Sequence, residues 1–317
     1  MQDTMDERPK VDALMDAGLG DWLAAQQALR DETKKKADSR TYVGFGGAAL
    51  AVFLGIMFTW PFQWILGLGG MSVVGGLAWA AWIRKPVELA IKSEMNVHIA
   101  KAIGFTYSVG GEAGRVFELA CAFDLLPSHD ENENEFEDFW FGTLDGIPMS
   151  LFEVHLQEWR GSGKNRRKET VFRGPLMVVD FTREFAGTTL IERDGARFKL
   201  FAGDTITLNE LSLDRAKMVH PDFEAAFDVW TTDQVEARYL VHPAYSERLI
   251  ALEQQFRGQS LRALFHRGQI IVAVETDRLF ESGSLDSDRD RALMQETIDQ
   301  FSSLADMAKA LNERARS

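Results

Sequence analysis

The chain has 317 residues, of which 45% are hydrophobic and 26% are charged, and its formal net charge is −13. Residues 1–40 contribute −2 and the pair at 84–85 contributes +2, so the residues after 85 carry −13 by themselves. A domain this acidic is repelled by nucleic-acid phosphates, so we expect no nucleic-acid partner. The single cysteine, Cys121, excludes a disulfide framework and a cysteine-based zinc site. We expect neither a bound metal nor a cofactor.

Residues 1–40 form a charged N-terminal segment, which we expect in the cytoplasm. Within it, the amphipathic pattern of residues 11–33 predicts a helix, although Gly18 and Gly20 weaken it. The polar face of this helix is acidic, which argues against binding to anionic lipid. We therefore expect the segment to dock on the rest of the chain or on a partner. Its predicted apolar face consists of Val11, Met15, Trp22 and Leu29.

The run of 43 residues at 41–83 contains no charged side chain. As a single helix it would extend about 64 Å, against a hydrocarbon core of about 30 Å. Two helices, at about 42–59 and 65–83, would each match the bilayer, so we predict a transmembrane hairpin over residues 41–84. The sequence WPFQW at 60–64 would form the turn, because proline breaks a helix and tryptophan favours the headgroup boundary. A soluble pair of buried helices is the alternative.

Basic residues flank this hairpin at both ends and none lies in its turn. By the positive-inside rule, both termini are expected in the cytoplasm. Small residues recur at a spacing of four in the two spans (Gly44/Ala48, Gly47/Ala51 and Ser72/Gly76), which predicts close helix packing. Packing of the hairpin on itself is favoured over dimerisation, and self-association stays open. The residues expected at the membrane interfaces are Arg40, Trp60, Pro61, Trp64, Arg84 and Lys85.

Residues 85–317 are predicted to form a cytoplasmic α+β domain with antiparallel hairpins and a long C-terminal helix. Residues 86–104 are predicted to start a new helix, with Pro86 in its first turn. Apolar residues at spacings of three and four predict the C-terminal helix over 287–314, and a shorter helix is predicted at 243–256. Asp-Gly at 145–146 and Arg-Gly at 267–268 mark hairpin turns. The predicted strands are 138–143, 147–158, 171–181, 188–192, 196–201, 227–231, 261–265 and 269–275.

Two charged runs are candidate binding segments. The acidic run at 129–138 has the start of a calcium loop, but Glu135 and Phe141 occupy the positions that need glycine and glutamate, so we expect a solvated connector. The run at 159–168 lacks the glycine spacing of a phosphate-binding loop, and it is predicted to form the tip of a hairpin. It is a candidate contact for a partner or for lipid headgroups, although exposed turns are often charged. Its basic residues are Arg160, Lys164, Arg166, Arg167 and Lys168.

Asp233, Glu236 and His242 are the weak candidates for catalytic residues. If residues 233–240 are helical, the two carboxylates share a face, and carboxylates near an imidazole can support acid–base chemistry. A structural network at the start of a helix is favoured instead, because no nucleophile or metal-ligand set accompanies these residues.

The chain resembles a bacterial membrane-protein family of unknown function, domain of unknown function 3137, over roughly residues 90–280. The resemblance rests on EDFWFGTLDGIPMSLFEVHLQ (137–157), TVFRGPLMVVDFTREFAGTTLI (170–191) and HPDFEAAFDVWTTDQVEARYLVHPAYSERLIAL (220–252). It implies a bacterial inner-membrane protein and a LemA-type membrane protein as partner. It implies no catalytic residue.

These features together predict a two-pass protein of the bacterial inner membrane, whose cytoplasmic domain is an interaction or scaffold module. Its expected partners are membrane lipid and another protein. A membrane-bound enzyme, such as a hydrolase using the residues at 233–242, is the alternative. A transporter or channel is disfavoured, because the two spans contain no ionisable residue.

Overall fold

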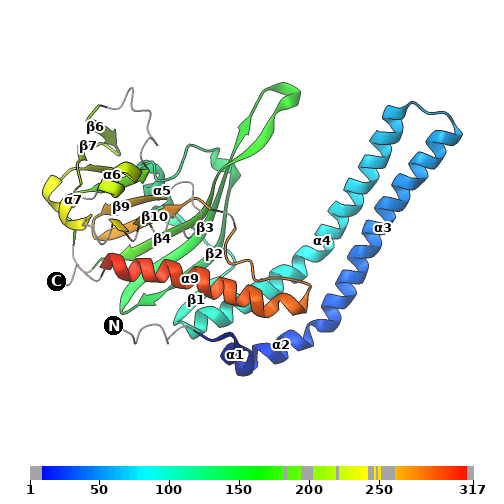
Figure 1. The fold of residues 1–317 in the computed structure, drawn as a ribbon, viewed down its shortest axis with the longest axis horizontal. Helices are drawn as coiled ribbons and strands as arrows, with labels where there is room; N and C mark the ends of the chain where they lie inside the picture. Colours follow the sequence, from blue (N-terminus) through cyan, green and yellow to red (C-terminus); the bar gives the residue numbers. More distant parts are fainter. Residues whose placement is uncertain are drawn as a thin grey trace. The chain divides into compact units, whose positions relative to one another are not determined.

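Figure 1 shows a computed structural model of the chain, which describes residues 9–181, 184–193, 203–218, 221–241, 246–247, 249–250, 261–276 and 278–312. Two long apolar helices precede an antiparallel sheet and a C-terminal helix, which confirms the predicted α+β class. The described residues divide into two compact units. The helical unit comprises the residues up to Ile99 together with Glu281–Thr297, and the sheet unit comprises Ala100–Phe280 together with the residues from Ile298 onward.

The N-terminal segment is broken rather than forming the single helix predicted over 11–33. Gly18 adopts a φ of 109°, a conformation that suits glycine and ends regular helix, so the segment consists of several short pieces. The buried side chains are Leu14, Leu19, Leu23, Arg30 and Thr33. None of the four residues of the predicted apolar face is among them, and Leu29 is exposed. The pieces are α1 (Val11–Leu14), a π-helical turn (Met15–Leu19), α2 (Gly20–Ala25) and then the long helix α3 (Gln27–Met57).

A short turn joins α3 to α4 (Phe62–Ala102), and Figure 1 shows the two helices lying antiparallel. Thr59 has a φ of 51°, and the Trp60 N–H donates to the Gly55 carbonyl over 2.8 Å, which is the Schellman pattern of helix ends. Pro61 immediately precedes α4, where its missing N–H costs no helical hydrogen bond. The turn is therefore shorter than predicted, because residues 62–64 already belong to α4.

Helix α4 continues through Pro86, so the prediction of a separate helix starting there was wrong. A proline inside a helix removes one backbone hydrogen bond and kinks or breaks it, at a cost of about 3 kcal/mol. Side-chain contacts on the following turns of α4, all within the helical unit, offset this cost. The Lys92 ammonium donates to Glu281 over 2.8 Å, and the Ser282 hydroxyl donates to the side chain of Asn96 over 2.9 Å.

Small residues bring the backbones of α3 and α4 into direct contact, as their spacing predicted. The Ser72 hydroxyl donates to the Gly44 carbonyl over 2.9 Å. A Cβ placed on Gly76 would lie 2.7 Å from the Gly44 Cα atom, closer than any real side chain allows. The hairpin thus packs on itself through glycine and serine.

The sheet unit contains one sheet of ten strands in the order β1-β2-β3-β4-β10-β9-β5-β8-β7-β6, and every neighbouring pair is antiparallel. The β3–β4 hairpin projects beyond its neighbours (Figure 1). The strands are β1 (Phe105–Ser108), β2 (Asn134–Leu144), β3 (Ile147–Arg160), β4 (Arg167–Asp180), β5 (Thr189–Arg193), β6 (Thr205–Leu208), β7 (Leu211–Ala216), β8 (Phe227–Thr231), β9 (Leu261–His266) and β10 (Gln269–Val274).

Helices cover both faces of this sheet. On one face, Phe117 of α5 (Gly114–Ala122) contacts Phe136 of β2, with ring centroids 4.9 Å apart. On the other face, Phe301 of α9 (Asp290–Asn312) lies 5.1 Å from the ring of Trp140. The central strands are consequently buried on both sides, which explains the nearly continuous apolar run at 151–154 in β3. The shorter helices are α6 (Pro221–Ala226) and α7 (Gln234–Leu240), with 3-10 turns at Glu131–Glu133, Gly163–Asn165 and Ser287–Arg289.

Six of the eight predicted strands are present with small changes at their ends. The strand predicted at 138–143 begins earlier, at Asn134, so part of the acidic run is strand rather than connector. A bulge at Asp138, whose φ is 56°, accommodates this extension. The predicted strand at 196–201 lies outside the described residues, as does most of the predicted helix at 243–256. The sequence patterns did not predict β1, α5, β6, β7 and α6.

Candidate functional site

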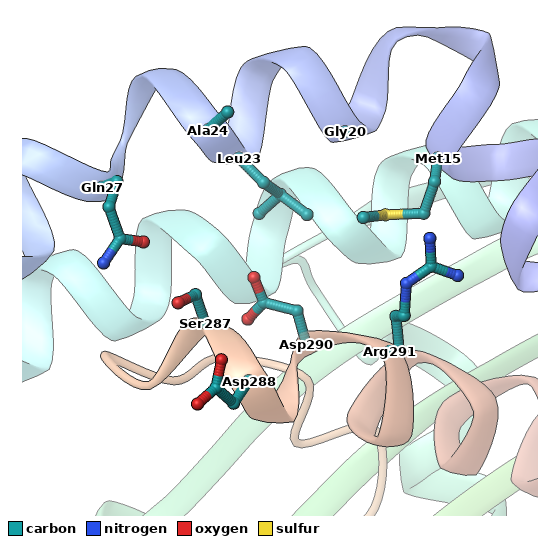
Figure 2. A pocket seen from close by; sticks show the side chains of 9 residues that line it. All are labelled: Met15, Gly20, Leu23, Ala24, Gln27, Ser287, Asp288, Asp290 and Arg291. Atoms are coloured by element: carbon teal, nitrogen blue, oxygen red, sulfur yellow. The ribbon is translucent and has the colours of Figure 1, made fainter.

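The helical unit contains a pocket of about 390 Å³ between its N-terminal helices and the first turn of α9 (Figure 2). One wall is largely apolar and comes from α2, its flanking turn and the start of α3. The opposite wall is polar and comes from residues 287–291. The lining residues are Met15, Gly20, Leu23, Ala24, Gln27, Ser287, Asp288, Asp290 and Arg291.

Local sequence shapes both walls. Leu23 and Gln27 are four residues apart on successive helical pieces and point towards the same space in Figure 2. Gly20 allows a close approach to the Met15 carbonyl, because a Cβ there would lie 2.9 Å from its oxygen. On the opposite wall, the Asp286 carboxylate accepts the Asp288 N–H over 3.4 Å and caps the 3-10 turn that leads into α9. This turn directs the Asp290 carboxylate towards α2 (Figure 2).

A buried ion pair lies at the polar wall. The Arg30 Nη1 atom donates to Asp290 Oδ2 over 2.7 Å, and the two side chains are 0% and 5% exposed. Within the described part of the chain, Asp290 Oδ1 and the Nε and Nη2 atoms of Arg30 have no hydrogen-bond partner. Buried ions without full hydrogen bonding are costly, so such groups are usually satisfied by water or by a ligand.

The electrostatic setting of Asp290 is unfavourable to its charge. Burial raises the pKa of the Asp290 carboxyl above its usual value, and the attraction of Arg30 opposes this rise without cancelling it. Repulsion from Asp286 and Asp288 raises the pKa further. A carboxylate held under these conditions gains from any additional hydrogen-bond donor that approaches it.

Other polar contacts hold residues 281–297 against the N-terminal helices. The ion pair between Arg291 of α9 and Asp12 of α1 is one such contact. The expectation that the N-terminal segment docks on another part of the chain therefore agrees with the contacts inside the helical unit.

Sequence reasoning missed this pocket. Arg30 and Asp290 are 260 residues apart, and neither belongs to a motif that signals a partner. Arg30 follows a stretch that has an acidic polar face, where an arginine is ordinarily solvated. Only the run DSDRDR at 286–291, dense in charge at a helix start, hinted at a polar site.

Two of the three weak catalytic candidates have structural contacts. Asp233 caps α7, because its Oδ1 atom accepts the N–H groups of residues 235 and 236 over 2.9 and 3.0 Å. The Glu236 carboxylate accepts the N–H groups of Ala186 and Gly187 over 2.8 and 2.7 Å. Both carboxylates thus hold a loop and a helix start in place, and His242 lies outside the described residues.

The basic run forms the tip of the β3–β4 hairpin, and most of its charge is paired locally. Arg160 contacts Glu158 and Glu169, and Lys168 contacts Glu133. The remaining described cations are Arg166, whose guanidinium lies 4.6 Å from the Trp159 ring centroid, and Arg167, which pairs with Glu169 over 2.5 Å. The side chain of Lys164 is outside the described part.

The predicted interface residues lie at the two ends of an exposed apolar hairpin. At one end Arg84 pairs with Asp38 over 2.7 Å, and the Arg40 guanidinium lies 4.3 Å from the Trp79 ring. At the other end Trp64 is 61% exposed. Both α3 and α4 are long and apolar enough to cross a membrane, and less than a fifth of the apolar window of each is buried.

Comparisons with known proteins give few relatives. No curated protein matches the chain. The crystal structure of the mycobacterial trehalose monomycolate transport factor A, TtfA, is similar with 11% sequence identity and a TM-score of 0.36, over 69% of this chain and 95% of that one. The model of the family described as protein of unknown function DUF3137 matches residues 170–313, which include two of the three stretches that carried the predicted resemblance. The resemblance to this family is therefore confirmed from residue 170 onward, and the match extends past the predicted range to residue 313. The stretch at 137–157 lies outside the match.

Proposed function

We propose that the protein is a two-pass anchor of the bacterial inner membrane that presents an interaction module at the cytoplasmic face. The observation that carries this proposal is the exposed apolar surface of α3 and α4. Side chains such as Phe53, Ile56, Met71 and Trp82 are between 63% and 74% exposed. Exposed apolar surface on this scale is unfavourable in water and suits lipid.

The dimensions of the hairpin support the same placement. From Arg40 to the end of α3 the helix rises about 26 Å, and from the start of α4 to Arg84 it rises about 33 Å. Both lengths are close to the hydrocarbon thickness of about 30 Å. The cations gather at one end and the tryptophans Trp60 and Trp64 lie at the other. By the positive-inside rule, this distribution supports the proposal that both termini lie in the cytoplasm.

We further propose that the tip of the β3–β4 hairpin is the contact surface for a protein partner. Trp159 is 38% exposed there, and the cationic groups of Arg166 and Lys168 lie 4.6 and 5.3 Å from its ring. Tryptophan and arginine are the residues most often found at the centres of protein interfaces. A LemA-type membrane protein is the partner class that the family resemblance implies.

Two experiments test this function. The chain should stay in the membrane pellet after an alkaline carbonate wash, and its release into the supernatant would contradict the anchor. A tagged full-length chain should co-purify with a co-expressed LemA-type protein from solubilised membranes, and Trp159→Ala should reduce the recovered partner at least fivefold. Phe141→Ala is the matched control, because Phe141 is an exposed aromatic residue on β2 away from the tip. Equal loss in both variants, or full recovery of the partner by Trp159→Ala, would contradict the tip as a protein contact.

A further inference from the structure

We propose that the pocket between α2 and the start of α9 binds an alkylammonium group, with Asp290 Oδ1 as the acceptor of its hydrogen bond. The group can come from a lysine side chain of a partner protein or from a free aliphatic amine. This inference goes beyond the membrane anchor and does not depend on it.

The Asp290 carboxylate can accept a further hydrogen bond. Its Oδ2 atom accepts from Arg30, while Oδ1 has no partner within the described part of the chain. Asp290 lines the pocket, and Figure 2 shows its carboxylate directed into the space below Leu23. A carboxylate that is nine-tenths buried and only half satisfied favours a ligand that donates a hydrogen bond.

The charged groups around the pocket favour a cationic ligand over an anionic one. Asp288 and Asp290 line the pocket together with Arg291, whose charge is engaged by Asp12. Arg30 also faces Asp290, but it binds only the Oδ2 atom. An anion would face the free oxygen of Asp290 at close range and would be repelled. A cation gains both the hydrogen bond and the Coulomb attraction, in a site where water is partly excluded.

The two walls of the pocket favour a ligand that has an apolar chain and a charged head. Met15 and Leu23 form an apolar wall facing the carboxylate. A methylene chain with an ammonium head satisfies both walls at once, as lysine does when its stem packs on apolar surface. The volume of about 390 Å³ falls within the range of small-ligand sites and accommodates one such chain.

Calorimetry with the full-length protein in non-ionic detergent micelles tests the proposal. The probes are n-butylammonium chloride and the peptide acetyl-Gly-Lys-Gly-amide, with sodium butyrate as the anionic counterpart. We expect saturable binding of at least one cationic probe and none of butyrate. Asp290→Asn should weaken binding at least tenfold, because it removes the charge at nearly constant volume. Asp21→Asn, at an exposed position of α2 that does not line the pocket, should change it less than threefold.

The results separate the two sources of the ammonium group. Binding of butylammonium alone supports a free amine, whereas tighter binding of the peptide supports a partner lysine. If Asp290→Asn fails to fold, Met15→Ala provides a second variant, which should weaken binding by removing part of the apolar wall without changing any charge. The proposal is overturned if no cationic probe binds saturably, as expected when ordered water alone satisfies Oδ1. It is also overturned if both folded variants bind as tightly as the wild type.

Discussion

Replacing Gly76 by alanine should loosen the hairpin of α3 and α4. The new Cβ atom would lie 2.7 Å from the Gly44 Cα atom and 2.9 Å from the Arg40 carbonyl oxygen, and both neighbours are backbone. Ordinary contact begins near 3.4 Å, so α3 and α4 would have to separate by about 0.7 Å at this point. Helices in lipid associate through such close packing, and an overpacked contact typically costs about 1–3 kcal/mol.

Gly75→Ala is the matched control, because a Cβ at Gly75 meets no atom within 4 Å. Alanine improves helix propensity equally at both positions, by up to about 1 kcal/mol, so this gain cancels in the comparison. The difference between the two variants should therefore fall between about 1 and 3 kcal/mol.

The assay is unfolding by sodium dodecyl sulfate in mixed micelles, followed by energy transfer between dyes on cysteines at Ser39 and Lys85 in a Cys121→Ser background. These positions lie beside the Arg84–Asp38 ion pair, so the dyes start close together and separate when the hairpin opens. Gly76→Ala should shift the midpoint to lower detergent concentration than Gly75→Ala. Coincident unfolding curves for the two variants would refute the contact between the helix backbones.

Three further predictions concern the sheet unit. Burial lowers the pKa of the His266 imidazole below 6.5, so the unfolded chain binds a proton more readily than the folded chain as the pH falls. The free energy of unfolding, measured by urea titration, should therefore decline below pH 6.5, and His266→Phe should reduce that decline. Asp233→Ala removes the cap of α7 and should lower the free energy of unfolding by about 1 kcal/mol, measured by urea titration, whereas Val235→Ala at an exposed position should have little effect. Burial and repulsion from Asp124 raise the pKa of Cys121 to about 11, so iodoacetamide should alkylate it at pH 8 at least tenfold more slowly than free cysteine.

The parts of the fold that the sequence predicted correctly are those with strong local patterns. The uncharged run at 41–83 predicted two long apolar helices because its length fits two spans and not one. Asp145-Gly146 predicted the β2–β3 turn, where both residues have positive φ. The apolar stripe from Met294 to Leu304 predicted α9, and its side chains are buried as expected.

The elements that escaped prediction lack such local signals. Strands β1 and β6 have four residues each and lie at the two edges of the sheet, so each is too short for a clear alternating pattern. The order of the central strands, with β4 beside β10, brings together segments about 90 residues apart. Periodicity within a strand carries no information about such a neighbour.

Tertiary contacts overrode local preference at two places. Pro86 normally marks a helix boundary, yet α4 passes through it, with its continuation anchored by Lys92 and Asn96. Arg30 is fully buried although arginine favours solvent, because its partner Asp290 comes from the far end of the chain. The pocket was therefore inaccessible to sequence reasoning, since both of its walls must be present before Asp290 is enclosed.

Cysteine labelling at position 63 tests most directly the proposed topology, in which the turn of the hairpin faces away from the cytoplasm. In a Cys121→Ser background, Gln63→Cys places one cysteine at the start of α4, where the side chain is exposed, and Ser39→Cys places one before the first span. A membrane-impermeant maleimide added to intact spheroplasts should label position 63, and it should label position 39 only after permeabilisation. Protection of position 63 in intact spheroplasts, with labelling after permeabilisation, would contradict a hairpin whose turn faces away from the cytoplasm.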